Sequence, residues 1–181
     1  LAWAAMLACV TTFALEGVSS HEVTVEVDVR RGLSAFTLVG RLQYKYADGT
    51  WNEWHALFDG GGGAQKSGWL SEDNGRYVFA FDAPLDGPAP AAESLRAGQS
   101  VAAGGQAWSV ASVSTAKLIA AQGELPFAPN LERGFVVADL RNARGEVATL
   151  DYGDPAAPKW SVGRSVAISE LAMTGLAESS E

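Results

Sequence analysis

The sequence has very few of the residues that build covalent or metal-based sites. Its 181 residues include a single cysteine, Cys9, so an intrachain disulfide and a zinc site made of cysteines are both excluded. The two histidines, His21 and His55, are too few for a histidine-rich metal centre. We therefore expect no bound metal and no other cofactor.

Basic residues are also scarce. The chain has 13 Lys and Arg against 21 Asp and Glu, a formal net charge of −8, and its densest basic cluster is Arg30-Arg31. Binding to a nucleic-acid backbone needs several clustered cations. We therefore expect no nucleic-acid partner, whereas composition leaves open which protein or small molecule the chain binds.

The sequence offers no apolar run of transmembrane length. Residues 1–15 are almost entirely apolar, but they are too few for a comfortable span and no basic residues precede them. We favour a buried strand or short helix here, with a membrane anchor as the alternative. We expect a cytoplasmic bacterial protein, and peripheral attachment to a membrane through residues 1–15 is the alternative location.

What the chain has in plenty is alternation and turn residues, including 20 glycines. In residues 21–29 the valines face one side and Glu, Thr and Asp face the other, which is typical of a half-buried strand. Hairpin turns are expected at Asp48-Gly49 and Asn74-Gly75. Strands are predicted around these turns, at residues 35–46, 51–58, 69–72 and 76–81.

Three prolines among residues 83–97 interrupt the pattern, which indicates a linker or an irregular crossing. Beyond it, short strands are predicted on both sides of Gly104-Gly105. Residues 115–122 fit either a helical turn or a strand, because the apolar run is too short to decide. Further strands are predicted at residues 135–140, 146–152 and 160–166, and a short helix or final strand at 169–176.

These patterns predict an all-β, mainly antiparallel fold with at most one or two short helices. We expect two small barrel-like or twisted-sheet units in tandem, residues 35–82 and 98–176, joined by residues 83–97. Residues 1–34 form an N-terminal segment with an added strand at 21–29, and residues 177–181 form a tail.

Short motifs between about residues 36 and 176 follow the order seen in one bacterial family. They include Val39-Gly-Arg41, Trp51-Asn-Glu-Trp54, Trp69-Leu-Ser-Glu72, Gly123-Glu-Leu-Pro126 and Ala148-Thr-Leu-Asp-Tyr152. On these motifs the chain resembles the family catalogued as domain of unknown function 4178. That family has no assigned catalytic residues, so the resemblance implies none here. Its members often carry a cysteine zinc ribbon before this domain, and the N-terminal residues of this chain lack those cysteines.

A second resemblance covers about residues 6–40. Residues 23–29 and 31–40 are similar to the start of the Lon-protease-like domain of magnesium-chelatase-like, competence-type AAA ATPases. The phosphate-binding motif G-x-x-x-x-G-K-[ST] of those enzymes is absent, so no ATPase activity follows. The two resemblances overlap at residues 36–40, and the chain therefore looks chimeric, with residues 1–34 of different origin.

Three tryptophans and a carboxylate form the candidate binding site: Trp51, Glu53, Trp54 and Trp69. Tryptophan rings beside a carboxylate suit an extended peptide, a cation or a sugar. Alternation puts Trp51 and Trp54 on opposite faces of their strand, which favours a packing role instead. Glu53 and His55 share a face and can do acid–base chemistry, but no nucleophile accompanies them and a structural histidine is favoured.

Four carboxylates near predicted turns form an alternative site: Glu124, Asp139, Asp151 and Asp154. Paired carboxylates can hydrolyse glycosides or bind Ca²⁺, although turn stabilisation is the ordinary explanation. We expect a non-enzymatic binding or scaffolding module that works through the aromatic face of the first unit or the seam between the units. The alternatives are a small hydrolase-like enzyme that uses the turn carboxylates and a membrane-associated accessory protein.

Overall fold

The chain is built almost entirely from antiparallel strands, in a computed structural model that describes residues 23–29, 32–58, 66–131 and 133–174. The strands are β1 (Val23–Val29), β2 (Gly32–Tyr46), β3 (Gly49–Phe58), β4 (Ser67–Asp73), β5 (Arg76–Asp82), β6 (Ser100–Ala103), β7 (Gln106–Gly123), β8 (Gly134–Arg141), β9 (Glu146–Asp151), β10 (Lys159–Val166) and β11 (Leu171–Thr174). The helical content of the described residues is two 3₁₀ turns, η1 (Ala92–Ser94) and η2 (Ile168–Glu170). The predicted all-β fold with at most two short helices is confirmed.

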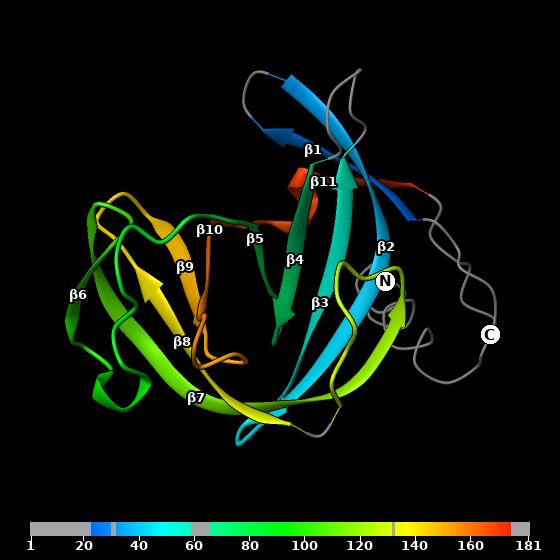
Figure 1. Cartoon of the computed structure of the whole chain (residues 1–181). Helices are drawn as coiled ribbons and strands as arrows, with labels where there is room; N and C mark the ends of the chain where they lie inside the picture. The colour runs from blue at the N-terminus through cyan, green and yellow to red at the C-terminus, as the bar shows by residue number, and fades with distance from the viewer. Residues whose placement is uncertain (1–22, 30–31, 59–65, 132, 175–181) are drawn as a thin grey trace.

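Eight strands close into a barrel in the order β2-β3-β4-β5-β10-β9-β8-β7, and β7 pairs back with β2 (Figure 1). The closing pairs include Gly40 opposite Gly123 and Leu42 opposite Ala121. Strands β1 and β11 extend the sheet beyond β2, and β6 extends it beyond β7. Strands from both halves of the sequence share this one barrel, so the expected division into two tandem units is not confirmed.

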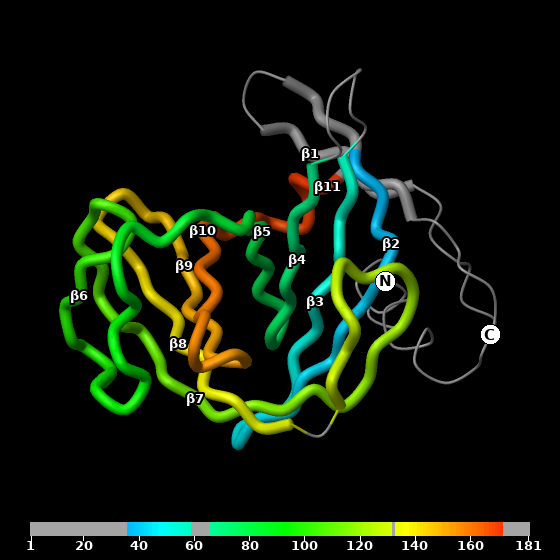
Figure 2. The backbone as a smooth tube through the Cα atoms, in the orientation of Figure 1, coloured from blue at the N-terminus to red at the C-terminus, as the bar shows by residue number. Residues whose placement is uncertain are grey.

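The long strand β7 makes the closure possible. Its residues 109–117 pair with β8, and its residues 117–123 pair with β2. A β-bulge between Val110 and Ser112 adds one residue and so exchanges the faces of the strand, as bulges do. Figure 2 shows the resulting course of β7, along the lower side of the barrel from β6 and β8 to β2. The stretch 115–122, left open between helix and strand by the sequence, is therefore strand.

The hairpin turn predicted at Asn74-Gly75 is confirmed, and the first turn lies at Ala47 and Asp48, one residue before the predicted Asp48-Gly49. At the tip of the β4–β5 hairpin, Asn74 and Gly75 have φ angles of 50° and 75°, the left-handed pair of a type I′ turn. The turn is closed by the carboxylate of Glu72, which accepts a hydrogen bond from the Gly75 backbone N–H at 2.9 Å. Strong turn residues therefore fix the register of this hairpin.

One face of the barrel strands carries the main apolar core. Side chains from β7 to β10 pack there beneath residues 83–99, which connect β5 to β6: Trp108, Val110, Ala138, Leu140, Ala148, Leu150 and Trp160. Leu95 of the connection is buried among them, and the Tyr152 hydroxyl donates to the Pro90 carbonyl at 2.7 Å. The segment predicted from its prolines to be a linker or an irregular crossing thus lies over this core.

A second apolar cluster lies on the same face of β2 to β5. Phe36, Ala56, Leu70 and Phe79 pack there with Val166 and Leu171. The Phe36 and Phe79 rings are 5.0 Å apart although two strands lie between theirs. A β-bulge interrupts the pairing of β2 with β3 between Leu38 and Gly40.

Strand β1 covers most of the alternating segment 21–29. It pairs with β2, with Val25 opposite Phe36, and with β11, with Val25 opposite Met173. The added strand is therefore confirmed for residues 23–29. The apolar stretch 1–15 and the tail 177–181 lie outside the described residues. Within the described part of the chain, no helix has the length and apolar character needed to cross a membrane.

Candidate functional site

Polar side chains gather on the other face of the barrel strands. Directly opposed residues of an antiparallel ladder share a face. By this rule the pairs Asp82–Ser161, Ser161–Thr149, Thr149–Asp139 and Asp139–Ser112 form one lateral row across β5, β10, β9, β8 and β7. On the same face β3 carries Trp51, Glu53 and His55, and β4 carries Trp69 opposite His55.

This polar face is the inside of the barrel. Strands β3 and β9 are four steps apart in either direction around the ring, yet the charge of Asp151 on β9 raises the pKa of Glu53 on β3. The rings of Tyr44 on β2 and Phe135 on β8 meet at 5.6 Å with β7 between their strands. Because the influence of Asp151 on Glu53 spans half of the ring, it acts across the barrel interior, and this face is therefore the inner one.

The inner face keeps access to solvent. Val78, Val137 and Ser161 are only half-buried there, and Asp139 is exposed. The apolar residues on the outer face, such as Leu70, Leu140 and Leu150, are almost fully buried. The inner face also carries buried side chains, namely Leu42, Tyr44, Leu118 and His55, so it is only partly open. Trp51 and Glu53 are half-buried on it.

Glu53 has the most perturbed carboxyl group of this face. Burial is the main cause that raises its pKa, to about 7, and the charges of Asp151, Asp139 and Asp82 raise it further. The opposing influence is a hydrogen bond from the Trp51 indole Nε1–H to Oε1 at 3.1 Å. The residue as a whole keeps some accessible surface, but its carboxyl group is enclosed, and the pKa follows the carboxyl group.

Two of the alternative carboxylates join Glu53. Asp139 accepts hydrogen bonds from Ser112 at 2.8 Å and Thr149 at 3.4 Å. The pKa of Asp151 is raised, mainly by burial, while the Gly153 backbone N–H at 2.6 Å and the charge of Lys159 oppose this shift. The sequence suggested two separate sites, and the closed barrel brings their members onto one face.

Glu124 and Asp154 do not belong to this group. Glu124 lies at an exposed position after β7, and it is its backbone carbonyl that contacts His55. Asp154 accepts a hydrogen bond from the Ala156 backbone N–H at 3.0 Å, which is the turn-stabilising role that the sequence favours. The expected trio Glu124, Asp139 and Asp151 is therefore not one cluster.

The aromatic residues divide as alternation predicts. Trp51 stacks on Tyr44 with ring centroids 4.8 Å apart, and Trp69 lies 6.1 Å from Phe127. Trp54 points to the opposite side and packs against the outer apolar cluster with Phe36. Of the proposed binding residues, Trp51, Glu53 and Trp69 share the inner face and Trp54 does not.

His55 links the inner face to the loop after β7. The residue is only 3% exposed, its ring centroid lies 5.1 Å from that of Trp69, and its Nδ1 lies 3.1 Å from the Glu124 carbonyl oxygen. That carbonyl lies over Gly40, where a Cβ would come within 2.2 Å of the oxygen. Nε2 is buried and has no hydrogen-bond partner among the described residues.

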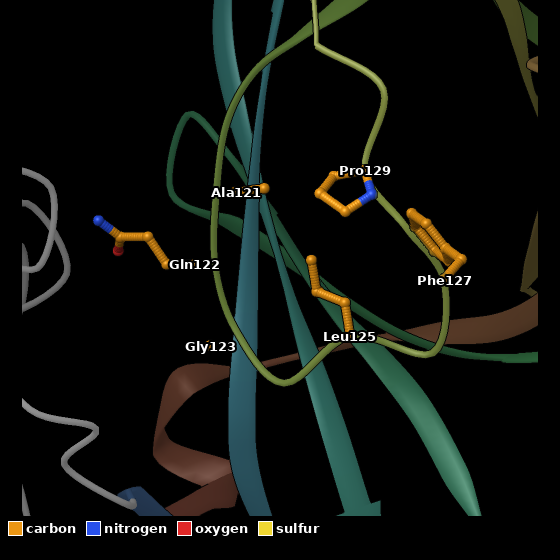
Figure 3. A pocket seen from close by; sticks show the side chains of 6 residues that line it. All are labelled: Ala121, Gln122, Gly123, Leu125, Phe127 and Pro129. Carbon is orange, nitrogen blue, oxygen red and sulfur yellow. The ribbon is translucent and has the colours of Figure 1, made fainter.

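A pocket of about 280 Å³ lies beside this contact, between the end of β7 and the loop that follows. Its lining consists of Ala121, Gln122, Gly123, Leu125, Phe127 and Pro129. Figure 3 shows Leu125 and Pro129 inside the bend of this loop, while the Gln122 side chain points away. Phe127 also lies under the Lys159 ammonium, 4.4 Å from its ring centroid, so the pocket adjoins the inner face.

Sequence reasoning missed Tyr44, Asp82 and the orphaned nitrogen of His55. Tyr44 and Asp82 are close to the predicted site only through strand pairing, which leaves no local signal. Across the described residues, no group of three or more His, Cys, Asp and Glu side chains is arranged to hold a metal ion.

The fold and its inner face define a class of protein: an eight-stranded antiparallel barrel lined by carboxylates and aromatic rings. Residues 27–167 match the family described as "Domain of unknown function (DUF4178)", and the chain belongs to this family. No curated protein and no solved structure matched the chain. The resemblance to AAA ATPases gains no support, since the family match already begins within the segment assigned to them.

Proposed function

We propose that this protein is a non-enzymatic binding module that takes a small molecule on the inner face of its barrel. One observation carries the proposal. The barrel interior carries four carboxylates, Glu53, Asp82, Asp139 and Asp151, beside the small apolar cluster of Leu42, Tyr44 and Leu118. The larger apolar clusters lie on the outer face beneath the connecting segments. Interiors of small barrels are usually filled by apolar side chains, or else hold one small ligand.

The chemistry of the inner face supports binding. Ligand sites combine apolar and aromatic walls with a few fixed polar groups. Here Tyr44, Trp51 and Trp69 supply flat apolar surface, and Glu53 is held in place by the Trp51 N–H. An interface with a protein partner, the scaffolding version of the proposal, would need these rings on an outer surface.

A thermal-shift screen of small molecules on the full chain tests the proposal. Hits should raise the unfolding temperature of the wild type, and Trp51→Leu and Glu53→Gln should reduce that shift. Glu93→Gln is the matched control, because Glu93 is an exposed carboxylate on the far cover segment. Hits that respond equally in all four proteins would refute an inner-face site.

A hydrolase is the second candidate, favoured by the pKa of about 7 at Glu53. A carboxylic acid that titrates near neutrality can donate a proton to a leaving group, and Asp139 and Asp151 are carboxylates on the same face. Turnover of chromogenic glycosides or esters that disappears in Glu53→Gln would establish it. A cytoplasmic location stays our expectation, as does membrane attachment through residues 1–15 as its alternative.

A further inference from the structure

We propose that the ligand of the inner face is an organic cation with an ammonium group, held between Glu53 and the unpartnered Nε2 of His55 and against the ring of Trp51. The inference rests on the proposed binding function and adds the chemical class of the ligand. Glu53 and His55 are two residues apart on β3, so both side chains project to the same side.

The hydrogen-bonding groups of this part of the barrel favour a ligand that carries a hydrogen-bond donor. The Glu124 carbonyl can only accept, so Nδ1 of His55 carries a proton, and in this tautomer Nε2 is an acceptor. The two ring nitrogens point in roughly opposite directions, so Nε2 is aimed away from the loop at Glu124. A buried acceptor without a partner is costly, and a ligand N–H would remove that cost.

The carboxylates of the inner face favour a cationic ligand. Glu53, Asp82, Asp139 and Asp151 all lie on the inner face, and the causes that act on the pKa of Glu53 include three carboxylates and no basic group. Lys159 acts on Asp151 instead, near the loop end of the barrel. An incoming ammonium would therefore stabilise the ionised form of Glu53, which burial and the neighbouring carboxylates disfavour, and such charge-assisted hydrogen bonds are strong.

The aromatic rings favour an organic cation over a simple metal ion. Trp51 stacks on Tyr44 and holds Glu53 through its N–H, so its indole ring lies beside the carboxylate. The apolar rings next to the carboxylate suit the hydrocarbon part of an organic ammonium ion, which a hydrated metal ion lacks. The arrangement of donors also offers no metal cluster among the described residues.

Three probes that share a benzyl group separate the contributions of charge and of N–H donors. Benzylammonium has charge and N–H donors, benzyltrimethylammonium has charge without N–H donors, and benzyl alcohol is neutral. Each is titrated into the full chain and followed by tryptophan fluorescence and calorimetry. We expect benzylammonium to bind at least about tenfold more tightly than benzyl alcohol, with benzyltrimethylammonium between them.

Matched variants then locate the site. Glu53→Gln keeps the shape and the acceptor for Trp51 but removes the charge, so it should weaken benzylammonium binding by about tenfold or more. His55→Asn keeps a donor for the Glu124 carbonyl and removes Nε2, so it should weaken benzylammonium and leave benzyltrimethylammonium unchanged. Glu93→Gln should bind all three probes as the wild type does.

The outcomes separate this inference from the function beneath it. Equal affinity for benzyl alcohol and benzylammonium, or no effect of Glu53→Gln on benzylammonium, overturns the cation while a Trp51-dependent hit still supports an inner-face binding site. Absence of saturable benzylammonium binding to the wild type overturns the cation as well. In that case the small-molecule screen decides the fate of the binding function separately.

Discussion

The raised pKa of Glu53 predicts that one carboxyl group makes the protein less stable as the pH rises. The folded-state pKa is about 7, against an ordinary value of 4.5. Because the folded protein holds this proton more tightly than the unfolded chain, protonation stabilises the fold. The stabilisation is complete below the unfolded pKa of 4.5 and is lost as the pH rises through about 7.

The size of the effect follows from the shift. A difference of about 2.5 pH units corresponds to about 3 kcal/mol at 1.36 kcal/mol per unit, and most of it falls between about pH 5 and about pH 8. Glu53→Gln mimics the protonated form and still accepts the Trp51 N–H. The variant should therefore match the wild type near pH 5 and gain about 2 to 3 kcal/mol over it near pH 8.

Urea unfolding of both proteins at the two pH values measures this difference. The comparison of variant with wild type cancels the titration of groups far from Glu53, and Glu93→Gln controls for the general loss of a negative charge. A gain for Glu53→Gln that is the same at both pH values would refute the reasoning. So would an equal, pH-dependent gain in Glu93→Gln.

Three further substitutions test the frame of the barrel by urea unfolding. Gly163→Ala should cost about 3 kcal/mol or more, because its Cβ would lie 2.0 Å from the Phe79 carbonyl oxygen where β10 meets β5; an unchanged stability would contradict this packing. Tyr152→Phe should cost about 1 to 2 kcal/mol by freeing the Pro90 carbonyl, and a neutral result would mean that this bond does not hold the cover segment. Asn74→Ala should cost about 1 kcal/mol because of the positive φ, whereas Asn74→Gly should not destabilise the hairpin.

Local sequence patterns predicted the strands well. Alternation in residues 23–29 and the Asn74-Gly75 turn correspond to β1 and to the β4–β5 hairpin. Both signals depend only on neighbouring residues, namely on side-chain direction and on backbone freedom. Where a short apolar run gave no period, at residues 115–122, the pairing with β2 and β8 settled the structure.

The candidate site could be predicted only in part. Alternation correctly separated Trp51 from Trp54, but which of the two faces is enclosed depends on how the sheet closes. The meeting of Glu53 with Asp151 depends on ladders between distant strands, β5 with β10 and β2 with β7. No local property of these residues encodes such pairings. The candidate site of tryptophans with Glu53 and the candidate site of turn carboxylates therefore looked unrelated in the sequence.

The two strand pairings that join the halves of the barrel, β2 with β7 and β5 with β10, also affect its folding during synthesis. The first pairing places Gly40 opposite Gly123 and the second places Ala80 opposite Gly163, and in each case the paired residues are 83 positions apart in the sequence. The meander β2 to β5 is synthesised long before β10. Until β10 is available, the edge of strand β5 therefore has no partner strand. Such late, long-range pairing is slow and leaves the nascent chain most prone to misassociate in the interval before β10 emerges.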